Sequence, residues 1–316
     1  MLTINSQQSR RALILGSMIA AIVAATGPGL ARSEERPPPR DSPIEREKLS
    51  LSGWDPDEPV PAYAYYKKGN RAMPVVIFMH GIRGSKEGDG QRLRDLAAKG
   101  YFVVAIDAHL HGERKIPGMF GPKSVLSDSG GEDYSIWFHQ SSVSHTARDV
   151  SKIIDALSAR GDVDASRIAV MGISMGSSTC MVLAWREPRI SVVVALIGAV
   201  DFWYDMTKTA PGPDQDAKRK ALSPRVRQLV ASLNPQDRMS AIAPKALFLA
   251  NGARDKGIDI QSVKKFVKEL QPSYKSYPDR LKFLEEPEVG HSVTDRMWNE
   301  GSEWLLRHLP PTKRKE

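Results

Sequence analysis

The chain has 316 residues, 41% hydrophobic and 26% charged, which is the composition of an ordinary globular protein and excludes a fibrous or disordered chain. The formal net charge is +8, but the basic residues are scattered and no basic stripe is interleaved with aromatic residues, so a nucleic-acid-binding function is poorly supported. The single cysteine, Cys180, cannot form an internal disulfide, and the fold must therefore depend on its hydrophobic core.

The first 31 residues have the pattern of an export signal. Arg10 and Arg11 precede an apolar run over residues 12–26, and Ala31 lies at a small-residue cleavage site. The run is short for a transmembrane helix, which needs roughly 20 apolar residues. We predict a signal peptide over residues 1–31 and a periplasmic or secreted protein with no membrane attachment after cleavage. The arginine pair leaves a twin-arginine route open beside the general secretory route, and an uncleaved anchor is the alternative.

The rest of the chain divides into a short linker and one folded domain. Residues 32–43 are rich in proline and charge and predict an extended linker. Residues 44–316 alternate apolar runs of strand length with segments of helical periodicity. The expected strands cover residues 48–51, 60–66, 75–79, 101–106, 168–171, 192–197, 246–250 and 281–284, the first two as an antiparallel pair. The expected helices cover residues 91–100, 143–157, 177–186, 262–270 and 297–309.

This alternation predicts an α/β fold, with a mostly parallel sheet covered by helices on both faces. In such sheets the functional site lies at the carboxyl ends of the strands. Residues that directly follow the predicted strands are therefore the candidates for chemistry.

The pentapeptide Gly172-Ile173-Ser174-Met175-Gly176 directly follows one predicted strand and directly precedes a predicted helix. A G-x-S-x-G sequence in that context is typical of a nucleophile elbow, in which a sharp, strained turn projects the serine hydroxyl from the strand end. We therefore interpret Ser174 as a catalytic nucleophile. The alternative is a glycine-rich turn with a bystander serine.

A serine hydroxyl needs a base, which in this arrangement comes last in chain order, after a carboxylate. Of the seven histidines, only His291 lies between the final predicted strand and the last predicted helix. The acid that orients the base should follow the penultimate strand, where Asp255 lies. Asp259 is the alternative acid, and a surface ion pair with its basic neighbours is the other interpretation of Asp255.

Catalysis of acyl transfer also needs backbone N–H groups that stabilise the oxyanion. The expected donors are the N–H of Met175, directly after the nucleophile, and the N–H of Ile82. Ile82 lies in the sequence His80-Gly81-Ile82-Arg83-Gly84, which follows the predicted strand at residues 75–79. A plain glycine turn is the alternative interpretation of this segment.

These motifs together resemble those of the α/β-hydrolase superfamily, near the dienelactone-hydrolase-like and prolyl-oligopeptidase-like esterases. The resemblance spans residues 48–309 and rests on the motifs at 78–81, 84–87, 107–114, 163–176, 252–255 and 290–291. It implies an eight-stranded sheet and a Ser–Asp–His triad, with no metal and no cofactor.

The chain departs from the resemblance at three positions. Dienelactone hydrolases carry cysteine in the elbow, where this chain has Ser174, which favours ordinary ester hydrolysis. Relatives often have a second glycine after the elbow, where this chain has Ser177. They commonly have proline after the acid, where this chain has Asp259.

His109 and His111 follow another predicted strand and could suggest a metal site. No carboxylate or cysteine cluster with metal-ligand spacing accompanies them, so we expect no metal there.

Two long segments, residues 115–142 and 201–244, begin at strand ends on the side of the expected site. Long loops in a compact domain are usually functional. We hypothesise that Trp137, Phe138, Phe202 and Trp203 help to form an apolar substrate pocket, with a role in the hydrophobic core as the alternative.

The sequence therefore predicts a serine hydrolase that cleaves small-molecule carboxylic esters through an acyl-enzyme intermediate. A peptidase, amidase or thioesterase would use the same triad. A non-catalytic binding protein on a hydrolase scaffold is the alternative from another class. The sequence does not specify the oligomeric state or the natural substrate.

Overall fold

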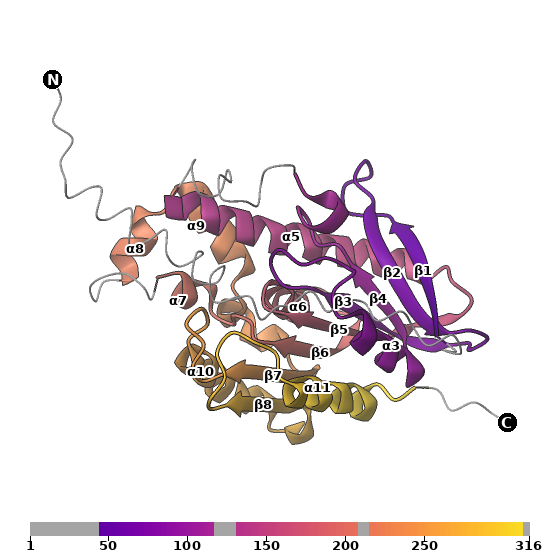
Figure 1. Ribbon diagram of the computed structural model, residues 1–316. Helices are drawn as coiled ribbons and strands as arrows, with labels where there is room; N and C mark the ends of the chain where they lie inside the picture. The colour runs from indigo at the N-terminus through magenta and orange to yellow at the C-terminus, as the bar shows by residue number, and fades with distance from the viewer. Residues whose placement is uncertain (1–43, 117–130, 208–214, 312–316) are drawn as a thin grey trace.

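The computed structural model of the chain describes residues 44–116, 131–207 and 215–311 (Figure 1). The predicted signal peptide and linker lie outside these residues. Within the described part of the chain, no helix combines the length and the hydropathy that a membrane-spanning helix requires.

The described residues contain one sheet of eight strands, in the order β1-β2-β4-β3-β5-β6-β7-β8. The strands are β1 (Ile44–Leu51), β2 (Val60–Lys67), β3 (Met73–Met79), β4 (Phe102–Ile106), β5 (Val163–Ile173), β6 (Ile190–Leu196), β7 (Ala246–Gly252) and β8 (Leu281–Glu286). β2 pairs antiparallel with β1 and with β4, and every other pair is parallel. The predicted antiparallel leading pair and the mostly parallel sheet are both confirmed.

The central strands consist of apolar residues because both of their faces are covered. All residues of β3, β4 and β7 are buried, as expected for parallel strands between two layers of helices. β1, at the edge of the sheet, instead alternates exposed and half-buried residues. The central strands thus form a rigid platform, and the segments that follow their carboxyl ends can be positioned accurately.

Helices connect the strands and cover the sheet. The α-helices are α3 (Gly90–Ala98), α5 (Gly131–Leu157), α6 (Met175–Arg186), α7 (Phe202–Thr207), α8 (Gln215–Ala221), α9 (Pro224–Leu233), α10 (Ile260–Leu270) and α11 (Asp295–His308). The 3₁₀ helices are η1 (Gly112–Arg114), η2 (Pro235–Ala241), η3 (Gln271–Tyr274) and η4 (Pro278–Arg280).

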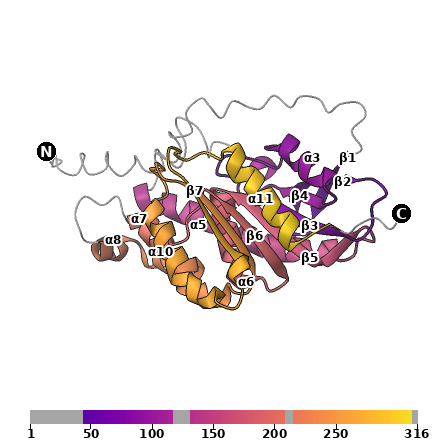
Figure 2. The ribbon, with the colours of Figure 1, turned by 90° about the horizontal axis from the view of Figure 1, so that it is seen from below.

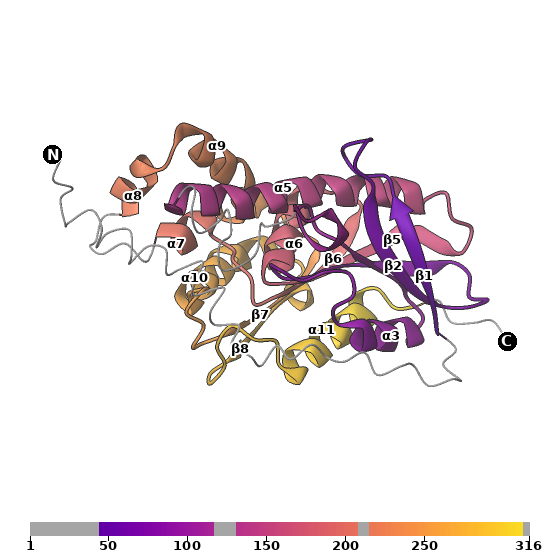
Figure 3. The same ribbon diagram turned by 45° about the horizontal axis from the view of Figure 1, so that its top comes forward.

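Two hydrophobic cores lie on opposite faces of the sheet. The larger core combines residues of α5, α6, α9 and α10 with one set of strand side chains, and the other core combines residues of α3 and α11 with the opposite set. Figure 3 shows α5 on one side of the sheet and α3 with α11 on the other, and Figure 2 looks onto the side covered by α11. The prediction of helices on both faces is confirmed.

The two long segments that we expected to be loops contain helices. α5 begins at Gly131, twelve residues before the periodic apolar positions that predicted it, so Trp137 and Phe138 lie on a helix. The second segment contains α7, α8 and α9, and Ser223 caps α9 by accepting the N–H of Val226. α9 packs against α5, and α7 packs against α8 and α9. Such short helices do not show the repeated apolar positions from which a helix is predicted, and for this reason the sequence pattern did not indicate them.

Candidate active site

Ser174 lies at the turn between β5 and α6, the strand–turn–helix context that the sequence predicted. Its backbone has φ 54° and ψ −111°, a conformation that is strained for a residue with a side chain. The turn is held by hydrogen bonds from the N–H of Ser174 to the carbonyl of Leu196 (2.9 Å) and from the N–H of Ser178 to the carbonyl of Ser174 (2.9 Å). These bonds to β6 and α6 keep the hydroxyl at the carboxyl edge of the sheet.

The glycines on either side of Ser174 are required by close approach of the backbone. A Cβ on Gly176 would lie 2.1 Å from the carbonyl oxygen of Met79, at the end of β3. A Cβ on Gly172 would lie 2.3 Å from the carbonyl oxygen of Gly176. Any side chain at these positions would push the elbow away from the neighbouring strand, so the two glycines determine where the serine sits.

The structure brings Ser174, His291 and Asp255 together from the ends of three strands. The hydroxyl oxygen of Ser174 lies 2.8 Å from Nε2 of His291, and Nδ1 of His291 lies 2.7 Å from Oδ2 of Asp255. The side chains of His291 and Asp255 are 5% and 0% exposed, respectively. Because Nδ1 donates its proton to the carboxylate, Nε2 is free to accept the serine proton.

Asp255, and not Asp259, faces the histidine. The second carboxylate oxygen of Asp255 accepts the N–H groups of Gly257 (2.7 Å) and Ile258 (3.0 Å). Asp259 instead caps α10 by accepting the N–H of Gln261 (2.9 Å), and it also accepts the hydroxyl proton of Tyr204 (3.0 Å). Asp259, the alternative acid, therefore has a structural role at the start of α10.

The loop that carries His291 packs directly on the loop that carries Asp255. The N–H of Arg254 donates to the carbonyl of Val289 at 2.9 Å, and a Cβ on Gly252 would lie 2.2 Å from that same carbonyl oxygen. The guanidinium of Arg254 pairs with Glu288, so the basic neighbour of Asp255 is directed elsewhere. The two loops thus hold His291 and Asp255 in one fixed arrangement.

The predicted oxyanion donors lie on both sides of the nucleophile. Met175 is the first residue of α6, so its N–H has no acceptor within the helix. Ile82 belongs to the turn closed by a hydrogen bond from the N–H of Gly84 to the carbonyl of Gly81 (3.0 Å). A Cβ on Gly81 would lie 3.5 Å from the Cβ of Ser174, so the turn is in van der Waals reach of the serine.

His80 ties this turn to the end of β4. Its Nε2 accepts the N–H of Ala108 at 3.1 Å, and its Nδ1 donates to the carbonyl of Gly81 at 2.7 Å. An Nε2 that accepts a hydrogen bond requires a neutral imidazole, and burial lowers the pKa of His80 below its ordinary value. The sequence showed this histidine in a glycine-rich motif but did not indicate its partners.

The four aromatic residues predicted to contact substrate divide into two pairs. Phe138 and Phe202 are each 1% exposed, which agrees with the alternative, a role in the hydrophobic core, and their contact with substrate stays a prediction. Trp137 and Trp203 are half-buried. The guanidinium of Arg225 lies 5.2 Å from the ring centre of Trp137, and that of Arg219 lies 5.1 Å from that of Trp203.

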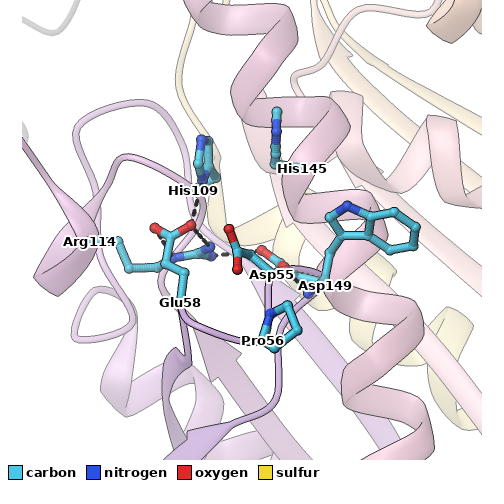
Figure 4. Close-up of a pocket in the computed structure, with 8 residues that line it drawn as sticks. Asp55, Pro56, Glu58, His109, Arg114, His145 and Asp149 are labelled. Carbon is cyan, nitrogen blue, oxygen red and sulfur yellow. Dashed lines mark hydrogen bonds and ion pairs between the residues drawn. The ribbon is translucent and has the colours of Figure 1, made fainter.

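A polar hollow of about 440 Å³ lies beside the segment that follows β4, between the β1–β2 connection and α5 (Figure 4). Three of its charged groups are paired with one another, because Glu58 and Asp149 both bind Arg114, at 3.1 and 2.8 Å. The rings of His109 and His145 stack with centroids 4.3 Å apart. None of the residues Ser174, His291 and Asp255 lines this hollow.

The ring of His111 lies near that of His80, with centroids 5.6 Å apart, and its Nδ1 lies 2.8 Å from the carbonyl oxygen of His109. The residues that the structure describes include no group of three or more histidine, cysteine, aspartate or glutamate side chains placed to hold a metal ion.

Sequence reasoning assigned no role to one further group of residues, Lys86, Asp107 and Glu113. Lys86 is 1% exposed and Asp107 is 0% exposed, and their side chains form an ion pair of 3.0 Å next to the Ile82 turn. The signal that could have indicated them is an aspartate directly after a buried strand, the same position in which the triad residues occur.

Comparisons with known proteins agree with this fold. A model of the prolyl oligopeptidase family matches residues 127–308, more than half of the chain. A Bacillus subtilis protein named "Putative esterase YitV" is 25% identical over 272 residues, which cover 84% of this chain and 100% of that protein.

Among solved structures, TT1662 from Thermus thermophilus has a TM-score of 0.64 and 22% identity, over 84% of this chain and 98% of that one. An acetyl xylan esterase from Paenibacillus sp. R4 has a TM-score of 0.64 and 19% identity, over 86% of each chain. The predicted α/β-hydrolase fold is confirmed, and the family match shows a hydrolase of the esterase and peptidase type. The chain belongs to the prolyl oligopeptidase family.

Proposed function

We propose that this protein is a serine hydrolase that cleaves carboxylic esters through an acyl-enzyme intermediate. The observation that carries the proposal is the continuous chain of hydrogen bonds from Ser174 through His291 to Asp255, with contacts of 2.8 and 2.7 Å. It has the geometry that a nucleophile, a general base and an orienting acid require.

In the first half of the reaction, Ser174 attacks the ester carbonyl while Nε2 of His291 takes the hydroxyl proton. Asp255 stabilises the imidazolium that forms, and the N–H groups of Ile82 and Met175 stabilise the negative charge on the carbonyl oxygen. His291 then gives the proton to the leaving alcohol, and the acyl group remains on Ser174.

In the second half, water replaces the alcohol. His291 removes a proton from the water, whose oxygen attacks the acyl-enzyme, and the carboxylic acid leaves as Ser174 recovers its proton. Both halves of the reaction use the same N–H donors, those of Ile82 and Met175, and the same base, His291.

For the substrate, we propose small-molecule esters with an apolar portion near Trp137 and Trp203, the two predicted aromatic residues that retain exposed surface. The esterase names of the relative from Bacillus subtilis and of the structural neighbour from Paenibacillus support ester over amide cleavage. Amide hydrolysis is the second candidate, because the matching family is named after oligopeptidases.

The test is hydrolysis of a p-nitrophenyl ester series, from acetate to decanoate, and of the corresponding p-nitroanilides. We expect the wild-type protein to hydrolyse the esters and Ser174→Ala to lose at least about 10³-fold in kcat/KM, a typical loss when a nucleophile is removed. Ser178→Ala is the matched control, since Ser178 is a buried serine one turn further along α6.

The outcomes separate the candidates. Faster cleavage of the anilides would favour the peptidase. A well-folded protein that is inactive on both series, with no labelling of Ser174 by a phosphonate probe, would overturn the proposal in favour of a non-catalytic binding protein.

A further inference from the structure

Lys86 is a buried charged residue in the loop between β3 and α3, with 1% of its surface exposed. Its ammonium lies 3.0 Å from Oδ2 of Asp107 and 2.7 Å from Oε1 of Glu113, and 5.2 Å from the ring centre of Tyr63. Burial alone lowers the pKa of Lys86, but the hydrogen bonds to Glu113 and Asp107 outweigh it and raise the pKa above its ordinary value. The side chain is therefore a fully partnered cation.

A buried ion pair is weak evidence for stability, because removing two charges from water offsets much of their attraction. In some proteins such a pair instead fixes one geometry among several. For Lys86, the pairing with Asp107 maintains the geometry of the loop between β3 and α3.

Asp107 holds the backbone of Lys86 as well as its side chain. Its carboxylate accepts the backbone N–H of Lys86 (2.7 Å), the ammonium of Lys86 (3.0 Å) and the N–H of Glu113 (2.9 Å). A Cβ on Gly112, whose φ is +57°, would lie 2.1 Å from Cγ of Asp107. The segment after β4 therefore wraps tightly around this carboxylate, which anchors the loop to the end of a central strand.

The anchored loop is the one that carries Ile82. Two successive turns form it, closed by bonds from the N–H of Gly84 to Gly81 and from the N–H of Gly88 to Ser85. Arg83 (φ 65°) and Asp89 (φ 57°) adopt left-handed conformations without being glycine. Such strained residues persist only where the surroundings hold them. Lys86 lies between the two.

We propose that Lys86 is a positioning residue for the oxyanion site: its ion pair with Asp107 keeps the N–H of Ile82 aimed at the reacting oxygen beside Ser174. Lys86 does not itself touch substrate, because its ammonium is occupied by Asp107 and Glu113. The inference rests on the proposed function. A displacement of about 1 Å can cost roughly 10²-fold in rate, and loss of one oxyanion donor costs about 10²- to 10³-fold in kcat.

The test compares Lys86→Met with Lys48→Met. Lys48 also pairs with Glu113, at 3.0 Å, but its side chain is 61% exposed and it makes no bond to Asp107. Both variants lose one positive charge near Glu113, and only the first removes the ion pair with Asp107. Ester turnover is measured per active site, counted by phosphonate titration of Ser174, so that partial unfolding does not imitate a catalytic loss.

We expect Lys86→Met to lower kcat by about 10- to 100-fold with KM changed by less than about 3-fold, since the N–H bond strengthens only in the transition state. A trifluoromethyl ketone, whose adduct with Ser174 carries an oxyanion, should bind more weakly by a similar factor. Lys48→Met should remain within about 2-fold of wild type. Lys86→Gln, which keeps a polar group, is the second variant if Lys86→Met does not fold.

An unchanged kcat per titrated site, a rise in KM alone, or an equal loss in Lys48→Met would overturn the positioning role. These outcomes apply when the wild-type protein shows ester turnover that depends on Ser174. A wild-type protein without Ser174-dependent turnover would instead overturn the proposed function, and this inference with it.

Discussion

Asp255 uses both oxygens of its carboxylate, one for the backbone and one for the base. Oδ1 accepts two N–H groups of its own loop, at 2.7 and 3.0 Å, and Oδ2 accepts Nδ1–H of His291. An asparagine at this position would place its oxygen on the two backbone donors, so its NH₂ group would face Nδ1. His291 would then have to carry its proton on Nε2, the nitrogen that must accept a proton from Ser174.

We therefore predict that Asp255→Asn folds normally but lowers kcat by about 10³- to 10⁴-fold, the effect expected when the base is held in the wrong tautomer. The measurement is kcat on a p-nitrophenyl ester, together with the thermal midpoint of unfolding. Asp259→Asn is the control. Its side chain caps α10, so that variant should keep near wild-type kcat and lose about 1 kcal/mol of stability at most. A larger catalytic loss in Asp259→Asn than in Asp255→Asn would reverse the assignment of the acid.

The proximity of the three residues proposed as a triad could be predicted because each follows a strand of a parallel sheet. That topology brings Ser174, Asp255 and His291 to one edge whatever the details of packing. Phe138 and Phe202 could not be placed in the same way. An aromatic residue near a strand end is compatible with the core or with a pocket, and only the packing of α5 and α7 decides between them.

At the level of elements, α6 packs against the end of β6 through Ser177 and Gly198. A Cβ on Gly198 would lie 2.1 Å from Oγ and 2.4 Å from Cβ of Ser177. Gly198 therefore leaves the space that the side chain of Ser177 occupies, a contact that the sequence alone did not reveal because the two positions are 21 residues apart.

This packing predicts a strong coupling between the two positions. Gly198→Ala should destabilise the protein by about 1–3 kcal/mol, because the new methyl group overlaps Ser177. Ser177→Gly should cost about 1 kcal/mol, since glycine weakens the first turn of a helix. The double variant should be more stable than Gly198→Ala alone, with a coupling free energy of at least about 1 kcal/mol. Urea unfolding of the four proteins measures this cycle, and additive effects would show that the two residues do not compete for space.

The predicted elements agree best with the structure where apolar runs are long, and least where helices are short. β3, β4 and α10 lie within a few residues of their predicted bounds, whereas α7, α8 and α9 lie in a segment for which the sequence predicts a long loop. Burial in the sheet leaves a strong hydrophobic signal, but a helix such as α8, with no buried residue, leaves almost none. The signal peptide and the export of the chain stay predictions.

For the molecule as a whole, the buried histidines make stability depend on pH. Burial and the neighbouring His145 lower the pKa of His109 to about 4. Burial and the neighbouring His80 lower the pKa of His111 to about 3. In the unfolded chain each imidazole has its ordinary pKa of about 6.5. As the pH falls below that value, the unfolded chain binds protons that the folded protein does not, so the free energy of unfolding decreases.

We therefore predict that the thermal midpoint falls between about pH 7.5 and pH 5. The loss in free energy is on the order of 2 kcal/mol per histidine at pH 5, and it levels off near pH 4 to 3, where the folded protein also binds the protons.

His111→Asn keeps a donor for the carbonyl of His109, which Nδ1 of His111 contacts at 2.8 Å, and removes one titrating group. This variant should start from a lower midpoint at pH 8 but decline less steeply, by the share of His111, because His80, His109 and His139 still bind protons only on unfolding. Ser174→Ala, which retains every histidine, should decline in parallel with wild type. Calorimetry between pH 8 and pH 5 measures the thermal midpoint of each protein. If the midpoints of His111→Asn and wild type fall with equal slopes, proton binding at His111 on unfolding does not cause the loss of stability.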